Sequence, residues 1–148
     1  MTPADLLLVG VLVLPGFTAC AEFGSYAFVH PVIRRLPTEH HVAVEKGLVR
    51  TFGRFMPIAM PSSLVILIVW ASFSGAAAWG AVGLWSVGLV TTLIVNVGIN
   101  ARTARIGAGE MSASAWLAMR RRWDTFQGVR SWAFLLTFIL VAFAFIGR

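Results

Sequence analysis

The stretch of sequence from residue 76 to residue 99 reads AAAWGAVGLWSVGLVTTLIVNVGI and contains no charged residue. It is longer than the roughly 20 residues with which an α-helix crosses about 30 Å of hydrocarbon. Three further long apolar stretches, 3–29, 52–73 and 126–146, surround it in the chain. Such long stretches without strict alternation indicate helices, because a helix pairs all its backbone polar groups internally. The sequence therefore predicts four transmembrane helices.

The composition of the 148-residue chain agrees with this prediction. Apolar residues make up 58% of the chain, charged residues only 12%, and the mean hydropathy is +0.82. Soluble domains carry about 25% charged residues, so the excess of apolar surface requires lipid. We expect a single all-α domain, residues 1–148, that forms an integral membrane four-helix bundle with the lipid bilayer as its main partner. The single cysteine, Cys20, excludes an internal disulfide.

The basic residues predict the orientation in the membrane. Eleven of the 12 lysines and arginines, all except Arg148, lie in two zones, one before or within the second span and one between the third span and the start of the fourth. With four spans both zones lie on one side, and the positive-inside rule makes that side cytoplasmic and both termini external. We interpret the zones as topology signals rather than as a nucleic-acid site. The zones comprise Arg34, Arg35, Lys46, Arg50 and Arg54, and Arg102, Arg105, Arg120, Arg121, Arg122 and Arg130.

A short interfacial helix is predicted before the second span and is expected to continue into it. Apolar residues recur there at helical spacing, opposite a polar face. Within the span, Pro57 and Pro61 each remove a helix hydrogen bond, which either shapes a cavity or is simply tolerated. The apolar stripe comprises Val42, Leu48, Val49 and Phe52, and the polar face comprises Glu45, Lys46 and Arg50.

Polar residues inside the spans define the candidate site. Glu22 lies within the first apolar stretch, about 12 Å along the helix from His30, and ionisable groups at bilayer depth are usually functional. Spacings of three and four residues place polar side chains on one face of each of three spans. We expect these faces to form one pocket in which Arg130 neutralises Glu22. The three sets are Glu22, Tyr26 and His30; Asn96 and Asn100; and Trp123, Gln127 and Arg130.

Two other interpretations of these polar residues remain open. Asparagine, glutamine and ion pairs also hold membrane helices together without any chemistry, and Asn96 and Gln127 taken singly fit that role better. His41 and Glu45 are four residues apart and could ligate a metal together with His40. We nevertheless expect no metal, because the chain contains neither an HxxxH nor an HExxH motif. The sequence does not indicate a cofactor or an oligomeric state.

Four motifs spread over nearly the whole chain resemble those of the anthrone oxygenase family of small four-helix membrane proteins. The chain departs from the family pattern at Gly98, where proline is frequent, and at Gln127, where histidine is frequent. The motifs are Ala21-Glu22 with His30-Pro31 and Arg34-Arg35-Leu36-Pro37; Gly53-Arg54-Phe55-Met56-Pro57; Asn96-Val-Gly-Ile-Asn100-Ala-Arg102; and Arg121-Arg122-Trp123-Asp124 followed by Gln127 and Arg130.

The resemblance implies an oxygenase-like enzyme that acts on a small, hydrophobic, phenolic or anthrone-type substrate. Its catalytic residues would be Glu22 or His30, which removes a proton, and Arg130, which stabilises the developing oxyanion. The substrate would contact Tyr26, Asn96, Asn100, Trp123 and Gln127.

Two functions from other classes stand beside the enzyme. A non-catalytic membrane scaffold or assembly protein would use the same polar residues only for packing. A small proton-coupled transporter would use Glu22 as its proton carrier. The long basic loops and Arg130 count against the transporter, because they fix the orientation and neutralise Glu22.

Overall fold

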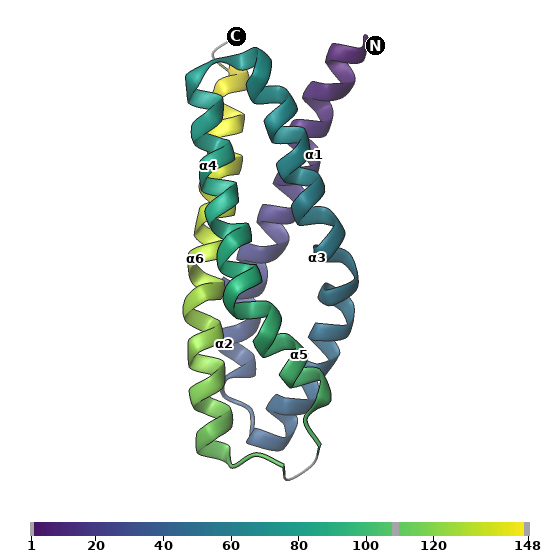
Figure 1. The fold of residues 1–148 in the computed structure, drawn as a ribbon. Helices are drawn as coiled ribbons and strands as arrows, with labels where there is room; N and C mark the ends of the chain where they lie inside the picture. The colour runs from purple at the N-terminus through teal and green to yellow at the C-terminus, as the bar shows by residue number, and fades with distance from the viewer. Residues whose placement is uncertain (1, 108–109, 147–148) are drawn as a thin grey trace.

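The computed structural model describes residues 2–107 and 110–146, and Arg148 lies outside them. Within these residues every regular element is helical, and four continuous helical segments are long and apolar enough to span a membrane (Figure 1). The predicted all-α four-helix architecture is thereby confirmed. The segments run Pro3–Ile33, Thr38–Ser74, Ala76–Arg105 and Ala113–Ile146.

The first segment consists of α1 (Pro3–Gly24), the π-helical turn η1 (Ser25–Val29) and α2 (His30–Ile33). A capping box starts it: the Asp5 amide donates to Thr2 Oγ1 at 3.2 Å, and the Thr2 amide donates to Asp5 Oδ2 at 2.7 Å. These bonds satisfy amides that have no partner within the helix. Pro3 fits the first turn, where no amide donor is needed.

The second segment is the single helix α3 (Thr38–Ser74), so the predicted interfacial helix continues into the second span without a break. Pro57 and Pro61 both lie inside it. α3 ends at Gly75, whose φ of 85° is a left-handed conformation that glycine adopts without a steric penalty. The chain turns at this one residue, and α4 (Ala76–Thr91) begins directly after it.

The third and fourth segments extend beyond the predicted spans. The third comprises α4, the π-helical turn η2 (Thr92–Asn96) and α5 (Val97–Arg105), and the fourth is α6 (Ala113–Ile146). The fourth span was predicted to begin at residue 126, because the charges before it suggested a loop. The helix in fact begins at Ala113, and Trp116, Arg120 and Trp123 of its early turns are buried in the bundle.

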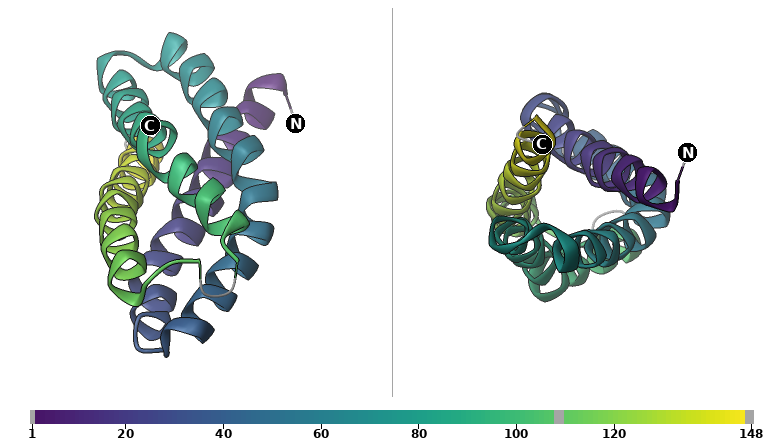
Figure 2. Two further views of the ribbon diagram at one scale, coloured as in Figure 1. Left: turned by 60° about the horizontal axis from the view of Figure 1, so that its bottom comes forward. Right: turned by 90° about the horizontal axis from the view of Figure 1, so that it is seen from above.

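The segments form a ring in which each packs against two neighbours, in the order α1, α3, α4, α6 (Figure 2, right). Trp85 of α4 stacks on Phe134 of α6 with 3.9 Å between ring centroids, and its indole donates to the Met60 carbonyl of α3 at 2.9 Å. Gly88 lies against the same Phe134 ring, where a Cβ would come within 2.5 Å of a ring carbon. The apolar core between α3, α4 and α6 is therefore closely packed on the side of the chain termini.

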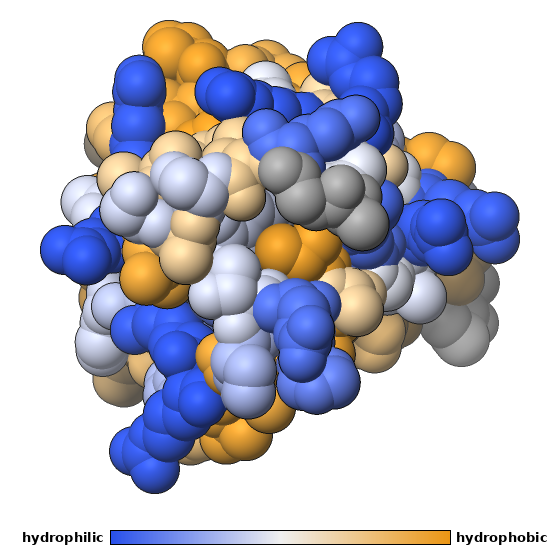
Figure 3. Space-filling view, turned by 90° about the horizontal axis from the view of Figure 1, so that it is seen from below, coloured by the Kyte–Doolittle hydropathy of each residue, from blue (hydrophilic) through white to orange (hydrophobic). Residues whose placement is uncertain are grey.

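Both termini lie at one end of the bundle, and the connections α2–α3 and α5–α6 lie at the other, which we call the basic end (Figure 1). Seen from the basic end, hydrophilic side chains are spread around the rim of the molecule, with apolar ones between them (Figure 3). The exposed arginines of this region are Arg34, Arg35, Arg50, Arg54, Arg102, Arg105, Arg121 and Arg122.

Candidate functional site

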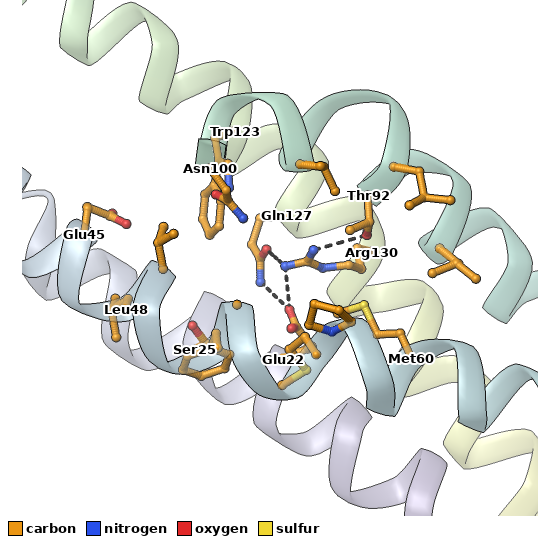
Figure 4. Close-up of a pocket in the computed structure, with 18 of the residues that line it drawn as sticks. Glu22, Ser25, Glu45, Leu48, Met60, Thr92, Asn100, Trp123, Gln127 and Arg130 are labelled. Carbon is orange, nitrogen blue, oxygen red and sulfur yellow. Dashed lines mark hydrogen bonds and ion pairs between the residues drawn. The ribbon is translucent and has the colours of Figure 1, made fainter. Parts of the chain in front are cut away.

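A cavity of about 210 Å³ lies between α1, α3, the third segment and α6, on the basic-end side of the core (Figure 4). Irregular helix geometry surrounds it: Ser25 belongs to η1, Thr92 and Leu93 belong to η2, and Pro57 and Pro61 interrupt the hydrogen bonding of α3. π-Helical turns occur mostly as local insertions and are frequent at functional sites. The cavity walls are mainly apolar, formed by Leu48, Val49, Phe52, Met56, Met60, Leu89, Leu93 and Val97.

One side of the cavity carries an ion-pair cluster that consists of Glu22, Thr92, Gln127 and Arg130. Arg130 Nη2 lies 2.7 Å from Glu22 Oε2, and Gln127 Nε2 donates to the same oxygen at 2.8 Å. Arg130 Nη2 also donates to Gln127 Oε1, and Nη1 donates to Thr92 Oγ1 at 3.1 Å. Figure 4 shows the Arg130 guanidinium joined to Glu22, Gln127 and Thr92, and Gln127 joined to Glu22 as well. The predicted pairing of Glu22 with Arg130 is thus present.

The ion-pair cluster is almost fully buried. Glu22 and Gln127 are 1% exposed and Arg130 is 5% exposed. Ser131 Oγ also donates to the backbone carbonyl of Glu22 at 3.2 Å, so the cluster ties α1 to α6. The Glu22 carboxylate thus has two partners on α6, the opposite charge of Arg130 and the amide of Gln127, which gives it the contacts of a structural ion pair between helices.

A second cluster, the Glu45 cluster, consists of His30, His41, Glu45 and Arg120. One carboxylate oxygen, Glu45 Oε1, lies 2.7 Å from Arg120 Nη2, 3.3 Å from His30 Nδ1 and 3.4 Å from His41 Nε2. All four residues are at most 3% exposed. Three segments of the bundle therefore meet at a single buried oxygen atom.

Two indole rings enclose the Glu45 cluster. The Arg120 guanidinium carbon lies 4.1 Å from the ring centre of Trp123 and 5.8 Å from that of Trp116, which is cation–π geometry. The His30 ring lies 4.7 Å from Trp123, and the His41 ring lies 5.4 Å from Trp116. These contacts fix the positions of both imidazoles and of the guanidinium.

The cavity is where the two clusters meet, because His30 and Glu45 line it together with Glu22, Gln127 and Arg130. Since His30 Nδ1 faces a carboxylate, a neutral His30 carries its proton on Nδ1 and keeps the lone pair of Nε2 as an acceptor. A carboxylate that orients a histidine in this way supports general-base chemistry. His30 therefore has the better geometry for accepting a proton, and Glu22 the poorer.

The structure brings most of the predicted site residues together, and their roles stay predictions. Glu22, His30, Asn100, Trp123, Gln127 and Arg130 all line the cavity. Asn100 Oδ1 accepts a hydrogen bond from Trp123 Nε1 at 2.7 Å.

Two predicted substrate contacts lie elsewhere. Tyr26 does not line the cavity; its ring lies over Gly128 of α6. It belongs to the π-helical turn η1, where one extra residue per turn breaks the four-residue periodicity on which its placement was predicted. Asn96 is fully buried and donates to the Trp123 carbonyl at 3.3 Å, so it joins η2 to α6.

Glu45, His41 and Arg120 were not among the predicted site residues. The apolar stripe of the segment before the second span placed Glu45 on its outer polar face, whereas the structure buries it. The four-residue spacing of His41 and Glu45, and of Trp116 and Arg120, was a usable signal, because residues four apart share a helix face.

The structure does not support the metal interpretation of His40, His41 and Glu45. His40 is exposed and lies 3.6 Å from Glu39, away from the buried pair. Among residues 2–107 and 110–146, no group of three or more histidine, cysteine, aspartate or glutamate side chains could hold a metal ion. Arg120 Nη2 lies 2.7 Å from Glu45 Oε1, so this carboxylate already has a cationic partner.

Comparisons with protein-family models, curated proteins and solved structures gave no match to this chain. The resemblance to the anthrone oxygenase family therefore stays a prediction from the four motifs.

Proposed function

We propose that the cavity binds a small, flat, hydrophobic molecule with phenolic or ketone oxygens, and that the protein oxygenates an anthrone-type substrate there. The observation that carries this proposal is the histidine–carboxylate pair His30–Glu45 beside a mainly apolar cavity. Ligand sites are typically apolar cavities with a few convergent polar groups. The ion-pair cluster and Asn100 supply such groups on the other walls.

The residues would contribute to the reaction by moving one proton and binding one anion. His30 Nε2 would accept a proton from the methylene carbon of the anthrone, leaving a delocalised carbanion whose oxygen is an enolate. Arg130 and Asn100 would stabilise the negative oxygen. The carbanion would add dioxygen to give a peroxide anion, which would take the proton back from His30. The hydroperoxide would then lose water, so that the carbon is oxidised from CH₂ to C=O and dioxygen is reduced.

Oxygen uptake by the protein in lipid nanodiscs tests this function. We expect uptake with a hydroxylated anthrone above its spontaneous oxidation rate. His30→Gln should lower the enzymatic rate by about 10²- to 10⁴-fold, the usual contribution of a general base. His40→Gln is the matched control, because His40 is exposed and outside the cavity, and it should keep the rate. Folded protein that never exceeds the spontaneous rate would contradict the proposal.

A second function, that of a non-catalytic scaffold, is favoured by one observation: Glu22 and Arg130 touch directly. Together with the Ser131–Glu22 bond, this contact ties α1 to α6 and has the character of interhelical packing. The scaffold predicts that the cavity binds no phenol. Equilibrium titration of the protein with a fluorescent hydroxyanthraquinone in nanodiscs separates the two functions.

A further inference from the structure

The cavity has an apolar side that is open to the surroundings of the bundle. Leu93 of η2 and Val97 of α5 line it, yet they are 61% and 49% exposed. On the opposite edge of the opening, Gly53 and Pro57 of α3 also line it and are exposed. An exposed apolar surface on a membrane-spanning segment faces lipid, so the opening between α3 and the third segment faces the bilayer.

At the end of the cavity nearest the basic end, the lining residues include His30 and Glu45 of the Glu45 cluster. A second cavity lies beyond it, lined by residues of α3, of the α5–α6 connection and by Trp116. Trp123 lines the first cavity and Trp116 lines the second, and the Arg120 guanidinium contacts both indole rings. The Glu45 cluster therefore stands between the two cavities.

We propose that the Glu45 cluster is a partition, and that the first cavity is filled from the bilayer by uncharged, lipid-soluble molecules rather than from the water at the basic end. A water-soluble ion would have to separate the buried pair Glu45–Arg120, which leaves a charge without its partner. An uncharged molecule passes between apolar side chains at the lateral opening and avoids this cost. The inference rests on the proposed function only for the identity of the ligand, since the access route is a property of the cavity.

Cysteine labelling in nanodiscs tests the partition without any substrate. In a Cys20→Ser background, Leu48→Cys places a thiol on the cavity wall, one turn from Glu45. Ser114→Cys, exposed at the start of α6, reports full access from water. We expect lipid-soluble N-ethylmaleimide to label both thiols, and a permanently charged methanethiosulfonate to label only the one at position 114. Labelling of Leu48→Cys by the charged reagent at the rate of the control would overturn the proposal, as would labelling by neither reagent.

Opening the partition should remove the difference between the two reagents at position 48. Glu45→Ala together with Arg120→Ala removes the ion pair that separates the two cavities and leaves neither charge without its partner. The charged reagent should then label Leu48→Cys at a rate approaching that of the control. If the folded double variant stays unlabelled, the Glu45 cluster is not the barrier and the proposal fails.

The lateral opening has its own matched pair of variants. Leu93→Trp narrows the opening and should slow labelling of Leu48→Cys by N-ethylmaleimide. Ile94→Trp adds the same ring at a neighbouring position that is 74% exposed but does not line the cavity, and it should leave the rate unchanged. Equal rates in the two variants would overturn lateral access. The labelling experiments do not measure oxygen uptake. A result against the access route can therefore be told apart from a result against the oxygenase function.

Discussion

At the scale of single residues, the energetics of Glu22 depend on its neighbours. The Glu22 side chain is 1% exposed, and its Oε2 atom lies 2.7 Å from Arg130 Nη2 and 2.8 Å from Gln127 Nε2. Taking both charges out of water costs nearly as much free energy as their attraction returns. The ion pair therefore adds little to the free energy of unfolding, although the loss of either partner alone lowers that free energy strongly.

Single and double replacements of this pair should behave differently. Glu22→Gln or Arg130→Gln should each lower the free energy of unfolding by about 3–5 kcal/mol, because each leaves a buried charge unpaired. The double variant Glu22→Leu with Arg130→Met should recover most of that loss. Unfolding in mixed micelles followed by circular dichroism measures both effects. Arg34→Gln is the control: Arg34 is 43% exposed where it pairs with Asp124, so its loss should be at most about 1 kcal/mol.

The orientation of His30 by Glu45 is also testable at this scale. With only three histidines in the chain, ¹⁵N-histidine labelling gives a spectrum simple enough to assign by substitution. We expect neutral His30 to carry its proton on Nδ1. In Glu45→Gln the amide can donate to Nδ1 instead, so the proton should move to Nε2. The same tautomer in both proteins would contradict the assigned role of Glu45.

The residue-level prediction from the sequence succeeded where helix periodicity is regular. The pairing of Glu22 with Arg130 followed from the matching depths of two charges in apolar helices. Tyr26 was misplaced because no sequence pattern announced the π-helical turn. Glu45 was overlooked because its burial depends on Arg120, a partner 75 residues away whose packing the local pattern of α3 does not contain.

At the scale of elements, α3 provides the wall that makes room for a ligand. Gly53 lines the cavity, and a Cβ added there would meet no atom within 4 Å outside its own helix turn. A larger side chain at this position should therefore occupy the cavity without disturbing the packing of the helices.

Gly53→Leu should accordingly weaken binding of a hydroxyanthraquinone while the protein stays folded. Gly47→Leu is the control, because Gly47 belongs to the same helix, is equally free of contacts and does not line the cavity. Fluorescence titration in nanodiscs gives both affinities, and the thermal unfolding midpoints of the two variants should be similar. Equal affinities in the two variants would show that the ligand binds outside this cavity.

The existence of each long helix was predictable, because an apolar stretch of sufficient length has few alternatives inside lipid. The helix ends were less predictable. Arg120, Arg121 and Arg122 suggested a loop, yet α6 already contains them, with Arg120 turned inward and its two neighbours exposed. Charged residues beside an apolar stretch therefore indicate where the apolar span ends, but they do not indicate where the helix itself ends.

At the scale of the whole molecule, the basic end and the terminal end differ sharply in charge. The orientation that follows from the positive-inside rule stays a prediction. Alkaline phosphatase fused after residue 146 should be active in a bacterial host, because it would lie outside the cytoplasm. The same enzyme fused after Gly107, in the α5–α6 connection, should be inactive. The reverse pattern of activities would show that the protein has the opposite orientation.

The two π-helical turns, η1 and η2, have a consequence for insertions and deletions in this chain. Each such turn holds one residue more than an α-helical turn. Deleting a single residue within Ser25–Val29 would remove that extra residue and let the turn close as an α-helical turn, so the helix on either side would keep its orientation to within about 20°. His30 would then follow Glu22 by seven residues and would stay on the face that it shares with Glu22. Deleting a second residue from the same stretch would instead turn His30 away from that face by about 100°.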